Sequence, residues 1–478
     1  MQLIPTYKWA KNVRALNATQ KSFLSQPWAS GVVLLVSVIV AMLLANLPFT
    51  RELYTSILDT DLSIHIQSPL RADGTRAIDW LFPDGMTVEK FINDILMVIF
   101  FFTVGLEIKR EVVNGELSSP KKAMLPVVAA AGGMLFPALI YATINHGTEA
   151  STGWGIPTAT DIAFAIGIMS ILGNKVPVSL KIFLTALAIA DDLGAIIVVA
   201  LFYGGSINFL LLGIALVLVI IIYLMNQQGE KRPMYYLIPA IAVWFLFYYA
   251  GVHATMSGVV MAFLIPMEGR YSRAYLERKN REYIRRLKQY NDLDDDKIED
   301  EFPNDMQRHC LRRMSHIATN CMGLSYRLEH ALNHWVNFLI MPIFALANAG
   351  VEIPDVSYFN IFQYTPELGS VSMGIFFGLL LGKPLGITLA SMLAIKGKVG
   401  EKPSGSTWPM LFAVACLGGI GFTMSIFVDT LSFGENAPEI TEHLRASGKI
   451  AVLAGSLCSG ILGSTLIVLL NKIKAKRI

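Results

Sequence analysis

Two adjacent carboxylates, Asp191 and Asp192, stand at the middle of an apolar run of sequence from Val178 to Tyr203. As an α-helix, this run of about 26 residues spans roughly 39 Å, which is enough to cross a bilayer. A charge at the centre of a membrane costs at least about 2.5–3.5 kcal/mol, and two neighbouring acids oppose each other's ionisation. Acids placed so deep usually bind or carry a positive charge. The alternative is a polar contact between helices, which an amide would make at lower cost.

Two other apolar segments carry residues that disfavour a continuous helix. The segment GIPTATDIAFAIG contains Pro157, Thr158, Thr160 and Asp161. The segment CLGGIGFTMS contains Gly418, Gly419 and Gly421, and each glycine costs about 1 kcal/mol in a helix. Unwound backbone at membrane depth is tolerated only inside the protein or beside a wet cavity, and some transporters place ion sites there. Close helix packing is the alternative role for these glycines.

Lys383 lies at the centre of the apolar segment GLLLGKPLGITL. It is roughly 17 Å from either end of its predicted span, too far for its side chain to reach water. A buried lysine needs a buried acid or helix C-terminal carbonyl groups as its partner; Asp161, Asp191 and Asp192 are well placed, and we expect the partner to be Asp191. Two carboxylates, the Thr160 hydroxyl and unwound carbonyl groups would form an oxygen-rich site for a hard cation. Because the same carboxylates bind protons, cation and proton would compete for this site.

The composition indicates a polytopic membrane protein. Of the 478 residues, 54% are hydrophobic and only 16% are charged, and the mean hydropathy is +0.52. A soluble chain would carry about 25% charged residues. The four cysteines are scattered and form no metal-binding pattern. Neither a nucleophile motif nor a metal triad occurs, so we expect no enzyme, no structural metal, no cofactor and no nucleic-acid partner.

Hydropathy predicts twelve membrane spans, which divide into two membrane regions, residues 28–266 and 328–470. Lys and Arg concentrate in alternate loops, which predicts a cytoplasmic N-terminal segment, 1–27, and a basic cytoplasmic tail, 471–478. The predicted spans are Trp28–Leu47, Phe91–Ile108, Ala123–Ile144, Ile156–Leu172, Val178–Tyr203, Phe209–Met225, Tyr235–Tyr249, His253–Pro266, Leu332–Ala349, Val371–Ile395, Trp408–Val428 and Ile450–Leu470.

Two polar excursions interrupt the spans. In the outer loop, about 48–90, the segments LSIHIQ and AIDWLF flank Asp73-Gly74 and predict a β-hairpin, with an irregular loop as the alternative. Because an isolated hairpin is marginally stable, it could pair with a second copy in a homodimer. The second excursion, residues 267–327, is a charged insert with a basic half followed by an acidic half. It predicts either a helical hairpin whose halves pair or a disordered segment, and its basic half either contacts anionic membrane lipid or is solvated.

Eight segments together carry a specific resemblance to a known family. TDIAFAIG, ALAIADDLGAI, GLEIKRE, GVHATMSGVV, LEHALNHWV, FALANAG, GKPLGI and GIGFTMSIF closely resemble the NhaA family of bacterial sodium/proton antiporters, and the similarity extends from about Trp28 to Leu470. This family is itself a known example of inverted repeats. The resemblance implies an all-α fold of about twelve transmembrane helices, with the fourth and eleventh interrupted and crossing. It also implies electrogenic exchange of Na⁺ or Li⁺ for protons by alternating access in the bacterial inner membrane.

The resemblance also implies roles for individual residues. Asp191 and Asp192 match the ion and proton carriers, with Thr160 beside them. Asp161 and Lys383 match the charges that offset the half-helix dipoles, and Lys383 also matches a partner of Asp191. Positions linked to pH response match Glu107, Arg110, Glu111, His253, Glu329 and His330.

Regulation is the least transferable property, because the charged insert departs from the family pattern and each of these six residues could simply be an interfacial polar group.

Two other functions are the alternatives to sodium/proton exchange. A sodium-coupled solute symporter would need an additional site for an organic substrate. A cation channel would need a continuous pore and a filter, and the sequence contains no filter motif.

Overall fold

A computed structural model of the chain describes residues 26, 28–67, 79–82, 85–205, 207–292, 305–353, 360–362, 364, 369–433 and 438–475. The chain divides into two compact units. The first comprises Met1–Phe100, Arg110–Gly205 and Trp335–Ile478, and the second comprises Phe101–Lys109 and Ser206–His334.

The first unit contains the crossing helices and the long helices around them. Its elements are α2 (Ala29–Asn46), α3 (Arg51–Leu58), β1 (Ile64–Gln67), β2 (Asp79–Phe82), α4 (Val88–Phe91), η1 (Ile92–Leu96), α5 (Met97–Asn114, whose middle belongs to the second unit), α6 (Pro120–Ile144), η2 (Glu149–Thr158), α7 (Ile162–Leu172), η3 (Gly173–Lys175), α8 (Val178–Phe202), η4 (Val336–Ile340), α15 (Met341–Asn348), α16 (Val371–Phe377), η6 (Gly378–Gly382), α17 (Lys383–Lys396), α18 (Trp408–Gly418), α19 (Phe422–Ser432) and α20 (Pro438–Ala475). The second unit contains α9 (Phe209–Gln227), α10 (Met234–Ala250), α11 (Thr255–Leu264), α12 (Arg273–Asp292), α13 (Asp305–Cys321) and α14 (Leu324–Trp335, whose last residue belongs to the first unit).

The helices agree with the predicted multi-pass fold. In the described part of the chain, eight helices are long and apolar enough to cross a membrane. Two bent helix pairs each form one broken span, and two further apolar helices, α10 and α11, are shorter. The helix starts differ most from their predictions in two spans: the ninth was predicted to begin at Leu332 but its helix begins at Leu324, and the twelfth was predicted to begin at Ile450 but α20 begins at Pro438. The first turns of α14 read LSYRLEHA, and these polar residues hide the helix start from a hydropathy criterion.

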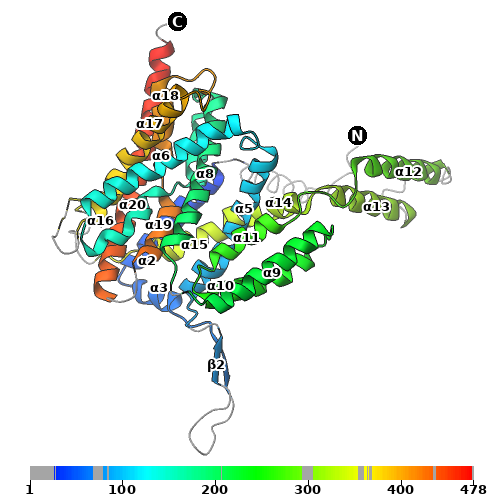
Figure 1. Cartoon of the computed structure of the whole chain (residues 1–478), viewed down its shortest axis with the longest axis horizontal. Helices are drawn as coiled ribbons and strands as arrows, with labels where there is room; N and C mark the ends of the chain where they lie inside the picture. Colours follow the sequence, from blue (N-terminus) through cyan, green and yellow to red (C-terminus); the bar gives the residue numbers. More distant parts are fainter. Residues whose placement is uncertain are drawn as a thin grey trace, which may run out of the picture. The chain divides into compact units, whose positions relative to one another are not determined.

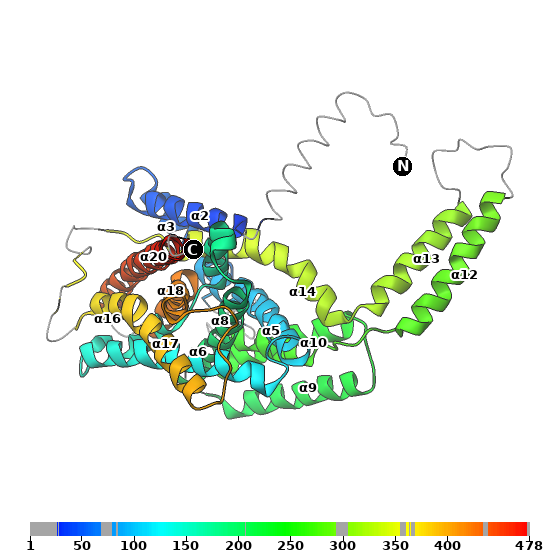
Figure 2. The same ribbon diagram turned by 90° about the horizontal axis from the view of Figure 1, so that it is seen from above.

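Small residues let the helices of the first unit approach closely. α17 lies alongside α6 (Figures 1 and 2). A Cβ atom added to Gly132 of α6 would lie 2.5 Å from the carbonyl oxygen of Gly386 in α17, so a side chain at this position would push the two backbones apart. Close approach of this kind is the usual way in which helices associate inside a membrane. The contact holds α17, which carries Lys383, against the centre of the unit.

The outer loop contains the predicted β-hairpin. Strand β1 pairs antiparallel with β2, with Ile64 opposite Phe82 and Gln67 opposite Asp79. An additional bridge between Asp61 and Thr87 extends the pairing toward the membrane spans. Pairing of strands therefore confirms the hairpin, whereas its expected turn, Asp73-Gly74, lies outside the described residues. Dimerisation through the hairpin stays a prediction.

The charged insert forms a pair of helices, but not the pair that its charges predicted. The basic helix α12 lies beside α13 in both views (Figures 1 and 2), and Cys310 and Ile317 of α13 are buried. The acidic residues 293–304, expected to pair with α12, lie outside the described residues. The prediction did not consider the apolar side chains of α13. Their burial stabilises the helix pair, and a pairing of exposed charges would not bury such side chains. The acidic side chains of α12 pair locally: a hydrogen bond from the Lys279 ammonium lowers the pKa of Glu282.

Candidate functional site

The first interrupted span breaks between Thr158 and Ile162. The 3₁₀ segment η2 ends at Thr158, α7 begins at Ile162, and the two axes differ by 40°. Pro157 has no backbone N–H to donate, and Ala159, two residues later, is extended, with ψ of 153°. Asp161 then caps α7, because its side-chain oxygen accepts a hydrogen bond from the Phe164 N–H at 3.2 Å. The predicted break in this span is confirmed.

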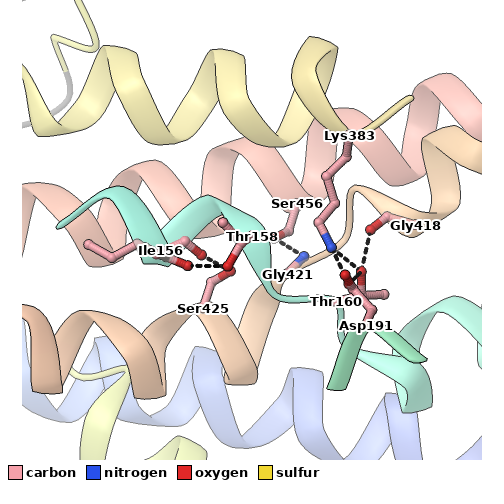
Figure 3. Close-up of polar contacts among 10 residues, drawn as sticks. Ile156, Thr158, Thr160, Asp191, Lys383, Gly418, Gly421, Ser425 and Ser456 are labelled. Atoms are coloured by element: carbon pink, nitrogen blue, oxygen red, sulfur yellow. Dashed lines mark hydrogen bonds and ion pairs between the residues drawn. The ribbon is translucent and has the colours of Figure 1, made fainter. Parts of the chain in front are cut away.

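The second interrupted span breaks at the predicted glycines. α18 ends at Gly418, α19 begins at Phe422, and the axes differ by 49°. Phe422 has a φ of +28°, a rare and costly conformation for a residue with a side chain. Its amide donates a hydrogen bond to the Ser456 hydroxyl of α20 at 3.0 Å, and the Gly421 amide donates one to the same hydroxyl at 3.2 Å (the latter in Figure 3). Ser456 thus holds the first turn of α19 in its strained position.

Asp161 joins the two breaks. Its backbone N–H donates to the Ile420 carbonyl oxygen at 2.7 Å. Its Oδ2 accepts hydrogen bonds from the Thr423 N–H at 3.2 Å and the Thr423 hydroxyl at 2.5 Å. One carboxylate therefore faces the N-termini of both α7 and α19, where a helix dipole favours negative charge. This arrangement agrees physically with the dipole-offsetting role that the resemblance implies for Asp161.

Lys383 reaches into the crossing from α17. Its ammonium contacts Asp191 Oδ2 and Thr160 Oγ1, and both Lys383 and Asp191 are almost completely buried (Figure 3). The ion pair expected from the sequence is present. Thr160 Oγ1 lies 2.5 Å from Asp191 Oδ2 and 2.8 Å from the Gly418 carbonyl oxygen, so its single proton can serve either acceptor. The cluster joins both breaks to α8 and α17.

A short π-helix positions the lysine. Residues Gly378–Gly382 form η6, and Lys383 follows as the first residue of α17, with Pro384 next to it. A π-helical turn adds a residue to the helix and changes the direction of the side chains that follow, and such turns are frequent at functional sites. The sequence predicted a buried lysine here, but nothing in it indicated the π-helix.

The cluster leaves oxygen atoms that a cation could contact. Asp191 Oδ1 accepts no hydrogen bond from any described residue, although it is buried. Asp192 is 2% exposed and interacts electrostatically with the Lys383 ammonium. Carboxylate, hydroxyl and carbonyl oxygens suit a hard cation such as Na⁺ or Li⁺. Among the described residues no group of three or more His, Cys, Asp or Glu side chains could hold a resident metal ion.

The six residues that the resemblance links to pH response belong to both units. In the first unit Arg110 donates a hydrogen bond to Glu111 at 3.1 Å, and Glu111 also accepts one from the Glu116 N–H. In the second unit His330 packs against Tyr326, with ring centroids 4.1 Å apart. The others in that unit are Glu107 in α5, His253 between α10 and α11, and the buried Glu329 in α14. These contacts do not test a role in regulation, which stays a prediction.

Sequence reasoning missed several polar residues of the second broken span. Thr423 and Ser456 were not selected, although both make the contacts described above. Asp429 was also missed: its side chain is fully buried in α19 and interacts electrostatically with Lys449 and Arg445 of α20. An aspartate within the apolar sequence FTMSIFVDTLSF was a usable signal, by the same argument that selected Asp191.

Two broken helices that cross beside a buried carboxylate–lysine pair define the class of fold, a polytopic membrane protein of NhaA type. The sequence comparisons give the family. Residues 21–467 match the model of the family described as Na⁺/H⁺ antiporter 1, and the chain belongs to this family. Relatives named Na(+)/H(+) antiporter NhaA include one from Pelagibacter ubique, 39% identical, covering 96% of this chain and 100% of the relative. Another, from Helicobacter pylori, is 38% identical and covers 97% of this chain and 98% of the relative.

Proposed function

We propose that the protein exchanges Na⁺ or Li⁺ for protons across the bacterial inner membrane, with Asp191 and Asp192 as the shared binding groups. The observation that supports this proposal best is the buried cluster of Asp191, Lys383 and Thr160 between the two broken helices. Its relatives are named for the same exchange, and antiporters are transporters rather than enzymes.

Competition at the carboxylates provides the coupling. A cation needs ionised carboxylate oxygens, and a proton occupies those same oxygens, so one bound ligand excludes the other. The Lys383 ammonium is a third competitor, because it already contacts Asp191 Oδ2. A cation that binds both aspartates would therefore displace the Lys383 ammonium from Asp191 or lengthen the contact between Lys383 and Asp191. Each change of ligand alters the charge in a site where charge is expensive, which favours a different arrangement of the surrounding helices.

Two carboxylates and one monovalent cation make the exchange electrogenic in this proposal. Two protons can return on Asp191 and Asp192 for each cation that leaves, so each cycle moves net charge. The short contacts at the crossing, through Asp161 and Thr160, allow the broken helices to shift together between an inward-open and an outward-open state. The positive residues of alternate loops support a cytoplasmic position for both termini. In this orientation the β-hairpin lies outside, where it could pair with a second copy in a homodimer.

We predict that the apparent affinity for Na⁺ rises with pH. At lower pH protons occupy the carboxylates that the cation needs, so more Na⁺ is required for half-maximal exchange. The measurement is the Na⁺ dependence of exchange in proteoliposomes, with the same pH on both faces, between pH 6.5 and 8.5. An apparent affinity that stays constant while only the turnover changes would contradict direct competition. Absence of any Na⁺-dependent proton movement would contradict the proposed function itself.

We also predict that the α12–α13 hairpin is dispensable for exchange. Its base is closed by a hydrogen bond from the Arg270 N–H to the Asn320 carbonyl oxygen, at 2.6 Å, so a short linker can join these ends. Replacing residues 271–319 by a short Gly/Ser linker removes both helices together and exposes neither partner's apolar face. Exchange in proteoliposomes should persist, whereas its pH profile is expected to change. Complete loss of exchange in a folded, monodisperse variant would make the hairpin part of the transport machinery.

A further inference from the structure

An apolar cavity of about 620 Å³ lies in the first unit, between α2, α7 and α20. Its walls include Leu35 of α2, Ile171 of α7 and Leu457 of α20, and these three side chains are 43%, 67% and 63% exposed. The cavity is therefore open along helices that are apolar enough to span a membrane. In a bilayer, the medium beside such a wall is hydrocarbon rather than water.

The lining of the cavity is almost entirely apolar. Ser456 accepts hydrogen bonds from the amides of Gly421 and Phe422, and Thr465 donates to carbonyl groups of its own helix. With these hydroxyl groups already engaged, the walls present mainly aliphatic and aromatic carbon. A hydrocarbon chain fits such a surface, whereas a polar ligand would lose its hydrogen bonds to water without replacement.

The cavity has a shallow end and a deep end. Thr465 of α20 lines the shallow end, and Leu453 of the same helix lines the deep end. From Thr465 to Leu453 the helix rises by about 18 Å. One leaflet of a bilayer has a hydrocarbon thickness of about 15 Å, half of the full core. The cavity is thus as deep as one lipid acyl chain is long.

Positive charge gathers beyond the shallow end. Lys175 follows four residues after Ile171, and Lys472 and Lys474 end α20; all three side chains are exposed. A hydrogen bond from the Asn471 side chain to the Lys175 carbonyl oxygen, at 2.7 Å, holds these two segments together. The sequence contains no Asp or Glu within residues 162–181 or 453–475. Each basic residue near a membrane surface contributes about 1 kcal/mol of attraction to anionic lipid.

The geometry points to a binding site for an anionic phospholipid of the leaflet that meets Lys175 and Lys472, with one acyl chain inserted in the cavity. The deep end of that chain would contact Ile420 and Phe422, which line the cavity at the break between α18 and α19. It would also contact Ser456, which caps the strained first turn of α19, and Phe164, whose ring packs against that of Phe422 at 4.4 Å. The bound lipid would thus brace the break from the membrane side, without touching the ion site. The effect on transport rests on the proposed exchange, whereas the lipid binding does not.

The test compares a variant that fills the cavity with a matched variant on the same helix. Leu457→Trp places a large side chain in the cavity, and Val32→Trp does so from α2. Leu469→Trp makes the same change at an exposed position of α20 that does not line the cavity. The full chain, purified in detergent with phosphatidylglycerol or phosphatidylcholine, is examined by native mass spectrometry for retained lipid.

We expect the wild-type protein and Leu469→Trp to retain phosphatidylglycerol, and both cavity-filling variants to lose about tenfold in occupancy. Lys175→Gln with Lys472→Gln should remove the preference for phosphatidylglycerol over phosphatidylcholine. Unchanged retention in both cavity-filling variants would overturn the site. Equal retention of the two lipids by the wild-type protein would overturn the assignment of an anionic headgroup.

Exchange in proteoliposomes gives the functional part of the test. The wild-type protein and Leu469→Trp should exchange several-fold faster with phosphatidylglycerol than with phosphatidylcholine, and the cavity-filling variants should lose this difference. A difference that persists in both cavity-filling variants would overturn the bracing role. If the wild-type protein retains lipid but shows no exchange in any lipid, the proposed function fails and the lipid site stands.

Discussion

Replacement of Asp192 by asparagine is expected to abolish Na⁺-dependent proton exchange while the protein still inserts and folds. The amide has nearly the same size as the carboxylate, so the packing around this buried position is kept. It carries no charge for a cation and neither takes up nor releases a proton. Loss of one charged ligand, at about 1.5–3 kcal/mol, lowers cation affinity by about 10- to 150-fold. Loss of a proton carrier removes the coupling as well, so the combined effect on exchange is larger.

The measurement is Na⁺-dependent proton movement in proteoliposomes, together with direct binding of Na⁺ to the purified protein. Asp59→Asn makes the same chemical change at an exposed position beyond α3 and serves as the control, with exchange expected near the wild-type rate. Exchange by Asp192→Asn at the wild-type rate would remove Asp192 from the site. Retained binding with no exchange would assign it a role in proton transport alone.

The sequence predicted the parts of this site that carry a local energetic cost. Three glycines in four residues weaken any helix, and a lysine at membrane depth requires a partner, so the break at Gly418 and the pair of Lys383 with Asp191 could both be inferred. The contacts that complete the site are not local. Thr423 meets Asp161 across 262 residues of sequence, and a serine or threonine in an apolar segment carries no signal for such a partner.

In the charged insert the sequence signal was strong, but it did not identify the helices that pack together. Its charge pattern was conspicuous and suggested that a basic half pairs with an acidic half, yet α12 packs against α13. Burial of Cys310 and Ile317 provides a contact that exposed ion pairs, typically worth less than about 1 kcal/mol, do not replace. Conspicuous charge therefore predicted that the segment leaves the membrane, but not which segments associate.

The pair of Lys383 and Asp191 leads to the second large prediction. Lys383→Ala leaves the Asp191 carboxylate buried without its counter-charge, because the other group that contacts Asp191 Oδ2 among the described residues is the neutral Thr160 hydroxyl. Removing one partner of a buried ion pair typically costs about 3–5 kcal/mol. The variant should therefore unfold at a clearly lower temperature than the wild-type protein. The loss should be larger at high pH, since a proton on Asp191 would remove the uncompensated charge.

The physical cause is tested by adding Asp191→Asn to Lys383→Ala. If the cost comes from the unpaired charge, the double variant should unfold at a higher temperature than Lys383→Ala alone. Lys396→Ala, at the exposed end of the same helix, is the matched control and should change stability little. The measurement is thermal unfolding of the purified proteins in one detergent at pH 6 and pH 8.5. If the two substitutions destabilise additively, within about 0.5 kcal/mol, the residues do not act as a pair and Lys383 stabilises the crossing through Thr160 instead.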